Sequence, residues 1–114
     1  MIILSMSSKR DNIAMSLTDK NNKEVVWYKE SYDWHLYFKH MDMQKYKNFI
    51  IKAVKSPQLV DYNKKRKSTD YYYLERILLN GSRKYIKVVV DYTESPAFIR
   101  TAHQTSNIGS AVAC

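Results

Sequence analysis

Cysteine and glycine are scarce in this chain of 114 residues, which contains one cysteine, Cys114, and two glycines. One cysteine excludes an internal disulfide and a structural zinc site built from thiolates. The two glycines stand far apart, so the chain has no glycine-rich loop that could cradle a phosphate. A lone thiol suits a reducing compartment, and we therefore expect a cytoplasmic protein. One cysteine, three scattered histidines and the lack of a glycine-rich loop also predict that no metal or cofactor is bound.

Long apolar runs are absent as well. No stretch approaches the roughly 20 apolar residues that a membrane-spanning helix needs. The start, MIILSMSSKR, places its apolar residues before its charges, which is the reverse of a secretory signal. The length predicts a single domain, and the lack of a long apolar run predicts that it does not contact a membrane. Its expected parts are an arm at 1–11, a hairpin at 12–30, a core at 31–105 and a tail at 106–114.

Positive charge, in contrast, is abundant. Nineteen Lys and Arg residues against eleven Asp and Glu give a net charge of +8, which attracts polyanions such as nucleic acids. A basic run, Lys64, Lys65, Arg66 and Lys67, shortly precedes Tyr71 and Tyr73. It favours an RNA-binding edge, where cations hold phosphates and bases stack on aromatic rings. The alternative interpretation is a solvated loop followed by tyrosines that simply suit a strand.

The hydrophobic periodicity changes halfway along the chain. Apolar residues recur at helical spacing in YDWHLYFKH (32–40) and in MQKYKNFIIKAVK (43–55), and Pro57 ends the second helix. Four strands follow in QLVDYN, YYYLERILL, KYIKVVVDY and FIRTAH, and Asn80-Gly81 predicts a hairpin between the middle two. We therefore expect an α+β fold, with two N-terminal helices on a four-stranded antiparallel meander and a short β-hairpin before them.

Polar side chains concentrate in the last expected strand, FIRTAH. Alternation along this strand places Ile99, Thr101 and His103 on one face and Arg100 on the other. An imidazole can give or take a proton near neutral pH, and a hydroxyl can orient a phosphate. His103 is thus the leading candidate for acid–base chemistry, with an ordinary surface histidine as the alternative. If Ile86 packs under the helices, Lys87 lies on the exposed face of the sheet.

The order of these motifs, DWHLYFKH, YYYLERI, YIKVVVDY and FIRTAH, resembles the phage-type branch of the barnase–EndoU–colicin–RelE nuclease superfamily. The resemblance covers roughly residues 31–105. It implies a metal-independent ribonuclease, often a toxin, that cleaves an RNA such as tRNA. It also implies an acidic antitoxin or immunity protein as a partner. The residues that match the catalytic pattern of the family are His35, His40, Arg76, Thr101 and His103.

Two interpretations without catalysis stay open. The same basic run and tyrosines suit a nucleic-acid-binding module, in which Lys64–Lys67, Tyr71, Tyr73 and Lys87 hold RNA. A basic protein that binds a protein partner is the second. His35 is equally well explained as a half-buried histidine at the edge of a core.

Overall fold

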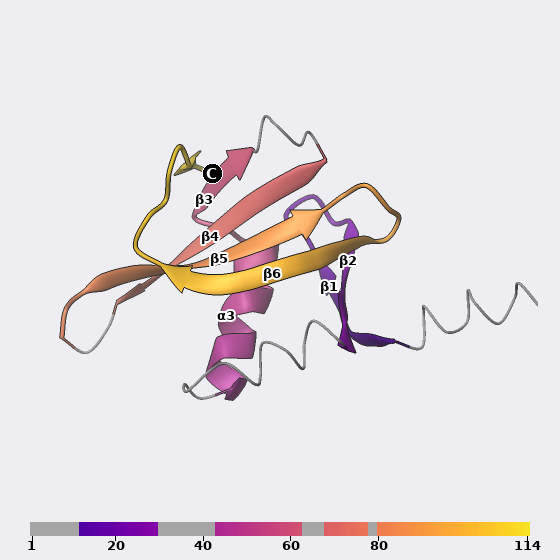
Figure 1. The fold of residues 1–114 in the computed structure, drawn as a ribbon, viewed down its shortest axis with the longest axis horizontal. Helices are drawn as coiled ribbons and strands as arrows, with labels where there is room; N and C mark the ends of the chain where they lie inside the picture. Colours follow the sequence, from indigo (N-terminus) through magenta and orange to yellow (C-terminus); the bar gives the residue numbers. More distant parts are fainter. Residues whose placement is uncertain (1–11, 30–42, 63–67, 78–79) are drawn as a thin grey trace, which may run out of the picture.

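The computed structural model describes residues 12–29, 43–62, 68–77 and 80–114, which form one mixed sheet with a helix against it (Figure 1). The strands are β1 (Ile13–Thr18), β2 (Glu24–Tyr28), β3 (Leu59–Tyr62), β4 (Thr69–Ile77), β5 (Arg83–Asp91), β6 (Ala97–Thr105) and β7 (Val112–Ala113). The helix is α3 (Met43–Lys55). Across the sheet the strands are ordered β1-β2-β6-β5-β4-β3-β7.

The predicted fold of two helices on a four-stranded antiparallel meander is wrong. The sheet has seven strands, and β2 runs parallel to β6. The described residues contain one helix, α3. The segment expected to form the first helix, 32–40, lies outside the described residues, as do the arm at 1–11 and the basic run at 64–67.

The β1–β2 hairpin is part of the main sheet because β2 pairs with β1 on one edge and with β6 on the other. Val25 and Val26 point to opposite faces, and both are fully buried. Burial on both faces is typical of a strand inside a sheet that pairs in parallel. The register beside β6 joins Val25 to Ala97 and Val26 to Phe98.

The C-terminal segment also joins the sheet, although we expected a loose tail at 106–114. Val112 and Ala113 pair with β3, and the Ser110 hydroxyl donates a hydrogen bond of 2.9 Å to Asp61. The turn before β7 uses Gly109 at a φ of +55°, a left-handed conformation that favours glycine. β7 therefore forms one edge of the sheet, and β1 forms the other.

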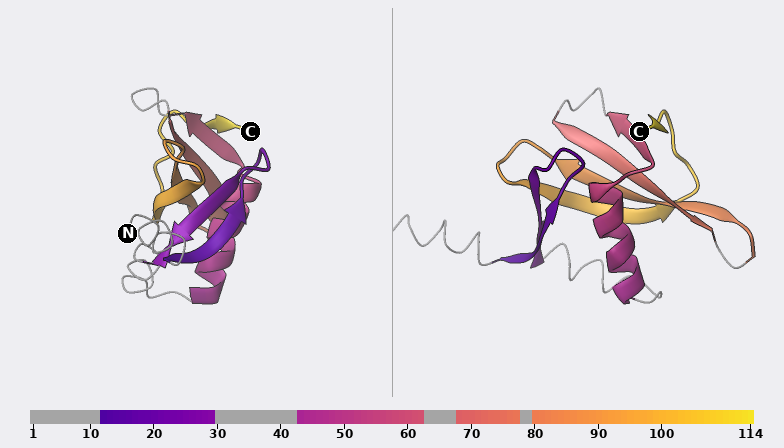
Figure 2. Two further views of the ribbon diagram at one scale, coloured as in Figure 1. Left: turned by 90° about the vertical axis from the view of Figure 1, so that its right-hand side faces the viewer. Right: turned by 180° about the vertical axis from the view of Figure 1, so that it is seen from behind.

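The core lies between α3 and one face of the sheet. The apolar stripe of the helix presents Ile50, Ala53 and Val54, all fully buried. On the central strands it meets alternate residues, namely Tyr72, Leu74, Ile86, Val88, Val90, Ile99 and Ala102. α3 passes behind β5 and β6 in Figure 1 and in front of them in the reverse view of Figure 2. The opposite face, which we call the outer face, carries no helix in the described part of the chain.

Candidate functional site

The outer face of the three central strands gathers most of the described residues that the sequence singled out. The register places Tyr73 beside Lys87 and Lys87 beside His103, in one row across β4, β5 and β6. The next row runs from Tyr71 through Val89 to Thr101. Four side chains of these two rows are partly exposed and can therefore contact a ligand. They are Tyr71, Lys87, Thr101 and His103. Thr101 and His103 of β6 therefore lie on the same face as the Lys87 ammonium group and the rings of Tyr71 and Tyr73.

Lys87 is positioned by the two tyrosines of β4. Its Nζ lies 4.0 Å from the centre of the Tyr71 ring and 5.8 Å from that of Tyr73. A cation over an aromatic face is attracted by the negative charge of the π-system. The two rings therefore hold the ammonium group above the outer face, on the row that also contains His103.

Tyr73 serves mainly as support for this surface. It is 2% exposed and meets Tyr85 edge-on, with ring centres 6.5 Å apart. Burial raises the pKa of Tyr73 to about 12, so its hydroxyl stays protonated at neutral pH. Beyond Tyr85, the Nε of Arg83 lies 3.2 Å from the Oε1 of Glu75, and this ion pair joins β5 to β4 near their connecting turn. Tyr71, which is more accessible, is the better platform for a base.

A β-bulge in β6 changes the face assignment that alternation predicts. Val90 pairs with Ile99 and Val89 pairs with Thr101, so Arg100 is the extra residue. Ile99 consequently packs in the core, whereas Thr101 lies on the outer face. The prediction that Ile99 shares a face with Thr101 is wrong for this reason. Alternation predicted that Arg100 lies on the face opposite Thr101, and this prediction is also wrong. The Arg100 side chain contacts Asp91, which lies on the outer face together with Val89.

Several predicted site residues lie outside what the structure describes. These are His35, His40, Lys64, Lys65, Arg66 and Lys67. For Arg76 the backbone is described but the side chain is not. Arg76 pairs with Lys84 and alternates with Leu74, which places it on the face opposite His103 and Lys87. The proposed meeting of His103 with a helix histidine therefore stays a prediction.

A buried polar network that the sequence did not reveal crosses the other end of the sheet. The Tyr92 hydroxyl donates to Asp19 at 2.8 Å and lies 2.6 Å from the Tyr72 hydroxyl, which is 3.3 Å from Asp70. Burial raises the pKa of both tyrosines and of Asp70. Asp19 also accepts backbone hydrogen bonds from Asn21 and Lys23 at 2.8 Å. The network thus ties the β1–β2 turn to β4 through Tyr92.

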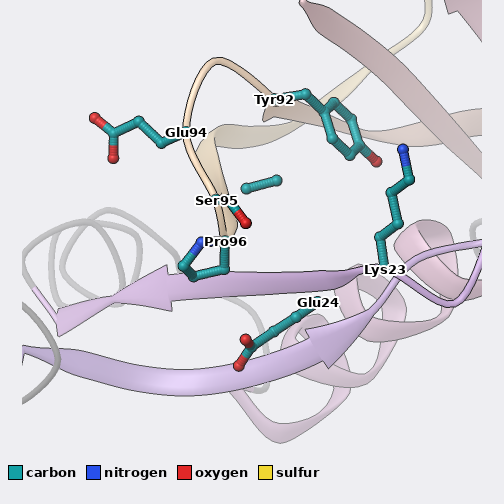
Figure 3. Close-up of a pocket in the computed structure, with 7 residues that line it drawn as sticks. Lys23, Glu24, Tyr92, Glu94, Ser95 and Pro96 are labelled. Atoms are coloured by element: carbon teal, nitrogen blue, oxygen red, sulfur yellow. The ribbon is translucent and has the colours of Figure 1, made fainter.

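A hollow of about 440 Å³ lies beside this network and is the other candidate for a binding site (Figure 3). Its lining combines Lys23 and Glu24 from the β1–β2 hairpin with Tyr92 and residues 94–97. Figure 3 shows the Lys23 side chain directed toward Tyr92, whereas Glu94 points away from both. Because its charges are mixed and diverge, the hollow defines no ligand. We take the outer face around His103 as the candidate site.

Neither known proteins nor a metal or membrane feature of the described residues points to another functional site. The chain matches no protein-family model, no curated protein and no solved structure. Among residues 12–29, 43–62, 68–77 and 80–114, no group of three or more His, Cys, Asp or Glu side chains could hold a metal ion. The one helix of the same residues is too short and polar to cross a membrane. The case for a function therefore depends on the residues of the outer face.

Proposed function

We propose that the protein is a metal-independent ribonuclease that binds single-stranded RNA on the outer face and cleaves it beside His103. The observation that carries this proposal is the row that joins His103 to Lys87, with Thr101 on the same face. Tyr71 adds an aromatic surface on which a base can stack. A proton-transfer group, a cation and a stacking surface are thus within one small patch.

The proposed reaction uses the ribose as its own nucleophile. A general base removes the proton of the 2′-hydroxyl, and that oxygen attacks the adjacent phosphorus. The bond between phosphorus and the 5′-oxygen breaks, and a general acid gives this oxygen a proton. The products are a 2′,3′-cyclic phosphate and a 5′-hydroxyl end. Because the nucleophile is already held beside the phosphorus, no metal is needed to bring the two together.

The residues divide these tasks by their chemistry. His103 is one of the two proton-transfer groups, since an imidazole can act as an acid or a base near neutral pH. The family resemblance assigns the other role to His35 or His40. Lys87 stabilises the negative charge that builds up on the phosphate, and the Thr101 hydroxyl orients it. Arg76, which the family resemblance also offers for this role, alternates with Leu74 on the helix-facing side of β4 and is therefore not assigned to it.

This function also suggests a partner and a location. A basic ribonuclease is dangerous to the cell that makes it, and an acidic antitoxin or immunity protein would complement its charge of +8. We place the protein in the cytoplasm, where its RNA substrate is found.

The test is cleavage of a short RNA by the purified protein in the presence of EDTA. We expect fragments that end in a 2′,3′-cyclic phosphate. His103→Ala should lower the rate by about 10²–10⁴-fold, the usual contribution of an acid–base residue, with RNA affinity and melting temperature near those of the wild type. Thr101→Val, the matched change on the same face, should cost less. Wild-type protein that does not cut RNA, or a folded His103→Ala variant that cuts at the wild-type rate, would contradict the proposal.

A non-catalytic RNA-binding module is the second candidate. It is favoured by one observation: the Nζ of Lys87 lies 4.0 Å from the centre of the Tyr71 ring, and a cation beside an aromatic ring is sufficient to bind RNA without cleaving it. A module of this kind would bind the same RNA through Tyr71 and Lys87 and release it uncut. The cleavage assay therefore separates the two functions directly.

A further inference from the structure

We propose that Arg100, oriented by Asp91, is a second phosphate-binding position on the outer face. It would hold a backbone phosphate that neighbours the scissile one. This inference rests on the proposed function, because it takes His103 as the point of cleavage. It adds a statement about the substrate, which must carry at least one further phosphate next to the scissile one.

The bulge gives Arg100 its direction. Regular pairing would turn its side chain away from Thr101, but the extra residue lets both reach the outer face. The guanidinium NH1 lies 3.4 Å from the Oδ2 of Asp91, and the side chain remains 45% exposed. In the described part of the chain this is its one charged partner. A guanidinium has five N–H donors in a planar fork, so most of them are left for a ligand.

Asp91 is a rigid support for that guanidinium. Its carboxylate is nearly buried and accepts two hydrogen bonds from Thr93, one from the backbone at 2.8 Å and one from the hydroxyl at 2.6 Å. Burial alone would raise the pKa of Asp91, but the bonds from Thr93 and the charge of Arg100 together lower it. The carboxylate is therefore ionised at neutral pH. Because it restricts the arginine in advance, less conformational entropy is lost when a phosphate binds.

The spacing along β6 identifies the ligand. Arg100 and His103 are three residues apart, and because Arg100 is the extra residue of the bulge, the distance along β6 is roughly 7–8 Å. The guanidinium of Arg100 is held at Asp91, which pairs with Phe98. His103 pairs instead with Lys87, so the two side chains do not converge on one phosphate group. This arrangement suits neighbouring phosphates of one strand that follows β6, with Thr101 between them. Arginine binds phosphate oxygens with two parallel hydrogen bonds, which suits a diester in a fixed orientation.

The first test measures binding to a 2′-O-methyl RNA oligonucleotide, which lacks the nucleophile and cannot be cut. Arg100→Gln should weaken binding and reduce the slope of log affinity against log salt by about 0.7, the value for one phosphate of a single strand. The matched control is Lys52→Gln, an exposed cation on α3, which should leave the slope unchanged. Arg100→Lys, which keeps the charge but loses the fork, should keep the slope and lose part of the affinity. An unchanged slope in Arg100→Gln would overturn the inference.

The second test compares two substrates. Arg100→Gln should lower kcat/KM for a longer RNA but leave it unchanged for a dinucleoside monophosphate, which has only the scissile phosphate. Equal losses on both substrates would mean that Arg100 acts through His103, and the separate phosphate position would be wrong. If the wild type cuts neither substrate yet the salt slope still falls in Arg100→Gln, the ribonuclease proposal fails and the phosphate position stands.

Discussion

Lys87 lies with its Nζ 4.0 Å from the centre of the Tyr71 ring and pairs with His103 across the β5–β6 ladder. The ring therefore keeps the ammonium group on the same face as the imidazole. This relationship depends on the alternation of both strands and on the bulge that sends Thr101 and His103 to the outer face. It makes Lys87 the cation of β5 whose loss should affect RNA binding most.

Lys87→Met keeps the length and the apolar stem of the side chain but removes its charge. We expect weaker RNA binding and a salt slope reduced by about 0.7, as for the loss of one phosphate contact. Lys55→Met, on the opposite side of the sheet in α3, is the control and should leave the slope unchanged. Equal slopes for the two variants would remove Lys87 from the interface.

Replacement of Lys64, Lys65, Arg66 and Lys67 by alanine tests the basic run that the sequence singled out. If the run holds the RNA backbone, its loss should reduce the salt slope by more than the single change at Lys87, because several phosphate contacts disappear. Filter binding over a series of salt concentrations measures this directly. A slope equal to that of the wild type would show that these four residues form a solvated loop.

Much of the sheet could be predicted from local sequence. The strands around Tyr72 and Val88 follow from their β-branched and aromatic residues, and Gly81 takes the positive φ of +85° that the Asn80-Gly81 turn requires. The position of α3 follows from the spacing of Ile50 and Val54 and from Pro57 just beyond its end. These signals depend on neighbouring residues alone.

The long-range features could not be predicted in the same way. The parallel contact of β2 with β6 joins residues about seventy positions apart, and only the unbroken apolar run from Val25 to Trp27 hinted at burial on both faces. The bulge at Arg100 has no glycine or proline to mark it, yet it decides which side chains share a face with His103. The candidate site therefore needed the register between strands as well as the strands themselves.

Asp91→Asn should destabilise the protein in a pH-dependent way. The folded-state pKa of Asp91 is lowered from its usual 3.8, so its ionised form contributes stability above about pH 4. That contribution is lost as the pH falls through the lowered pKa. We expect the variant to lose about 1.5–3 kcal/mol of unfolding free energy at pH 7, the usual value of hydrogen bonds to a charged group, and less at pH 3. Urea unfolding of the wild type and the variant at both pH values measures the gap.

Tyr72 and Tyr92 should act as one unit in the stability of the fold. Tyr92→Phe removes the 2.8 Å hydrogen bond to Asp19, whose carboxylate is almost fully buried, and should cost about 1.5–3 kcal/mol of unfolding free energy. Tyr72→Phe breaks the 2.6 Å contact between the two hydroxyls and should cost about 0.5–1.5 kcal/mol.

Because the two hydroxyls contact each other, the Tyr72→Phe/Tyr92→Phe double variant should lose less than the sum of the single losses, by about 0.5–3 kcal/mol. Thermal or urea unfolding of the four proteins in the cycle measures this coupling. Tyr85→Phe, on the outer face and outside the network, is the control and should change stability by less than about 0.5 kcal/mol. Additive losses in the double variant would mean that the two tyrosines stabilise the β1–β2 turn and β4 independently.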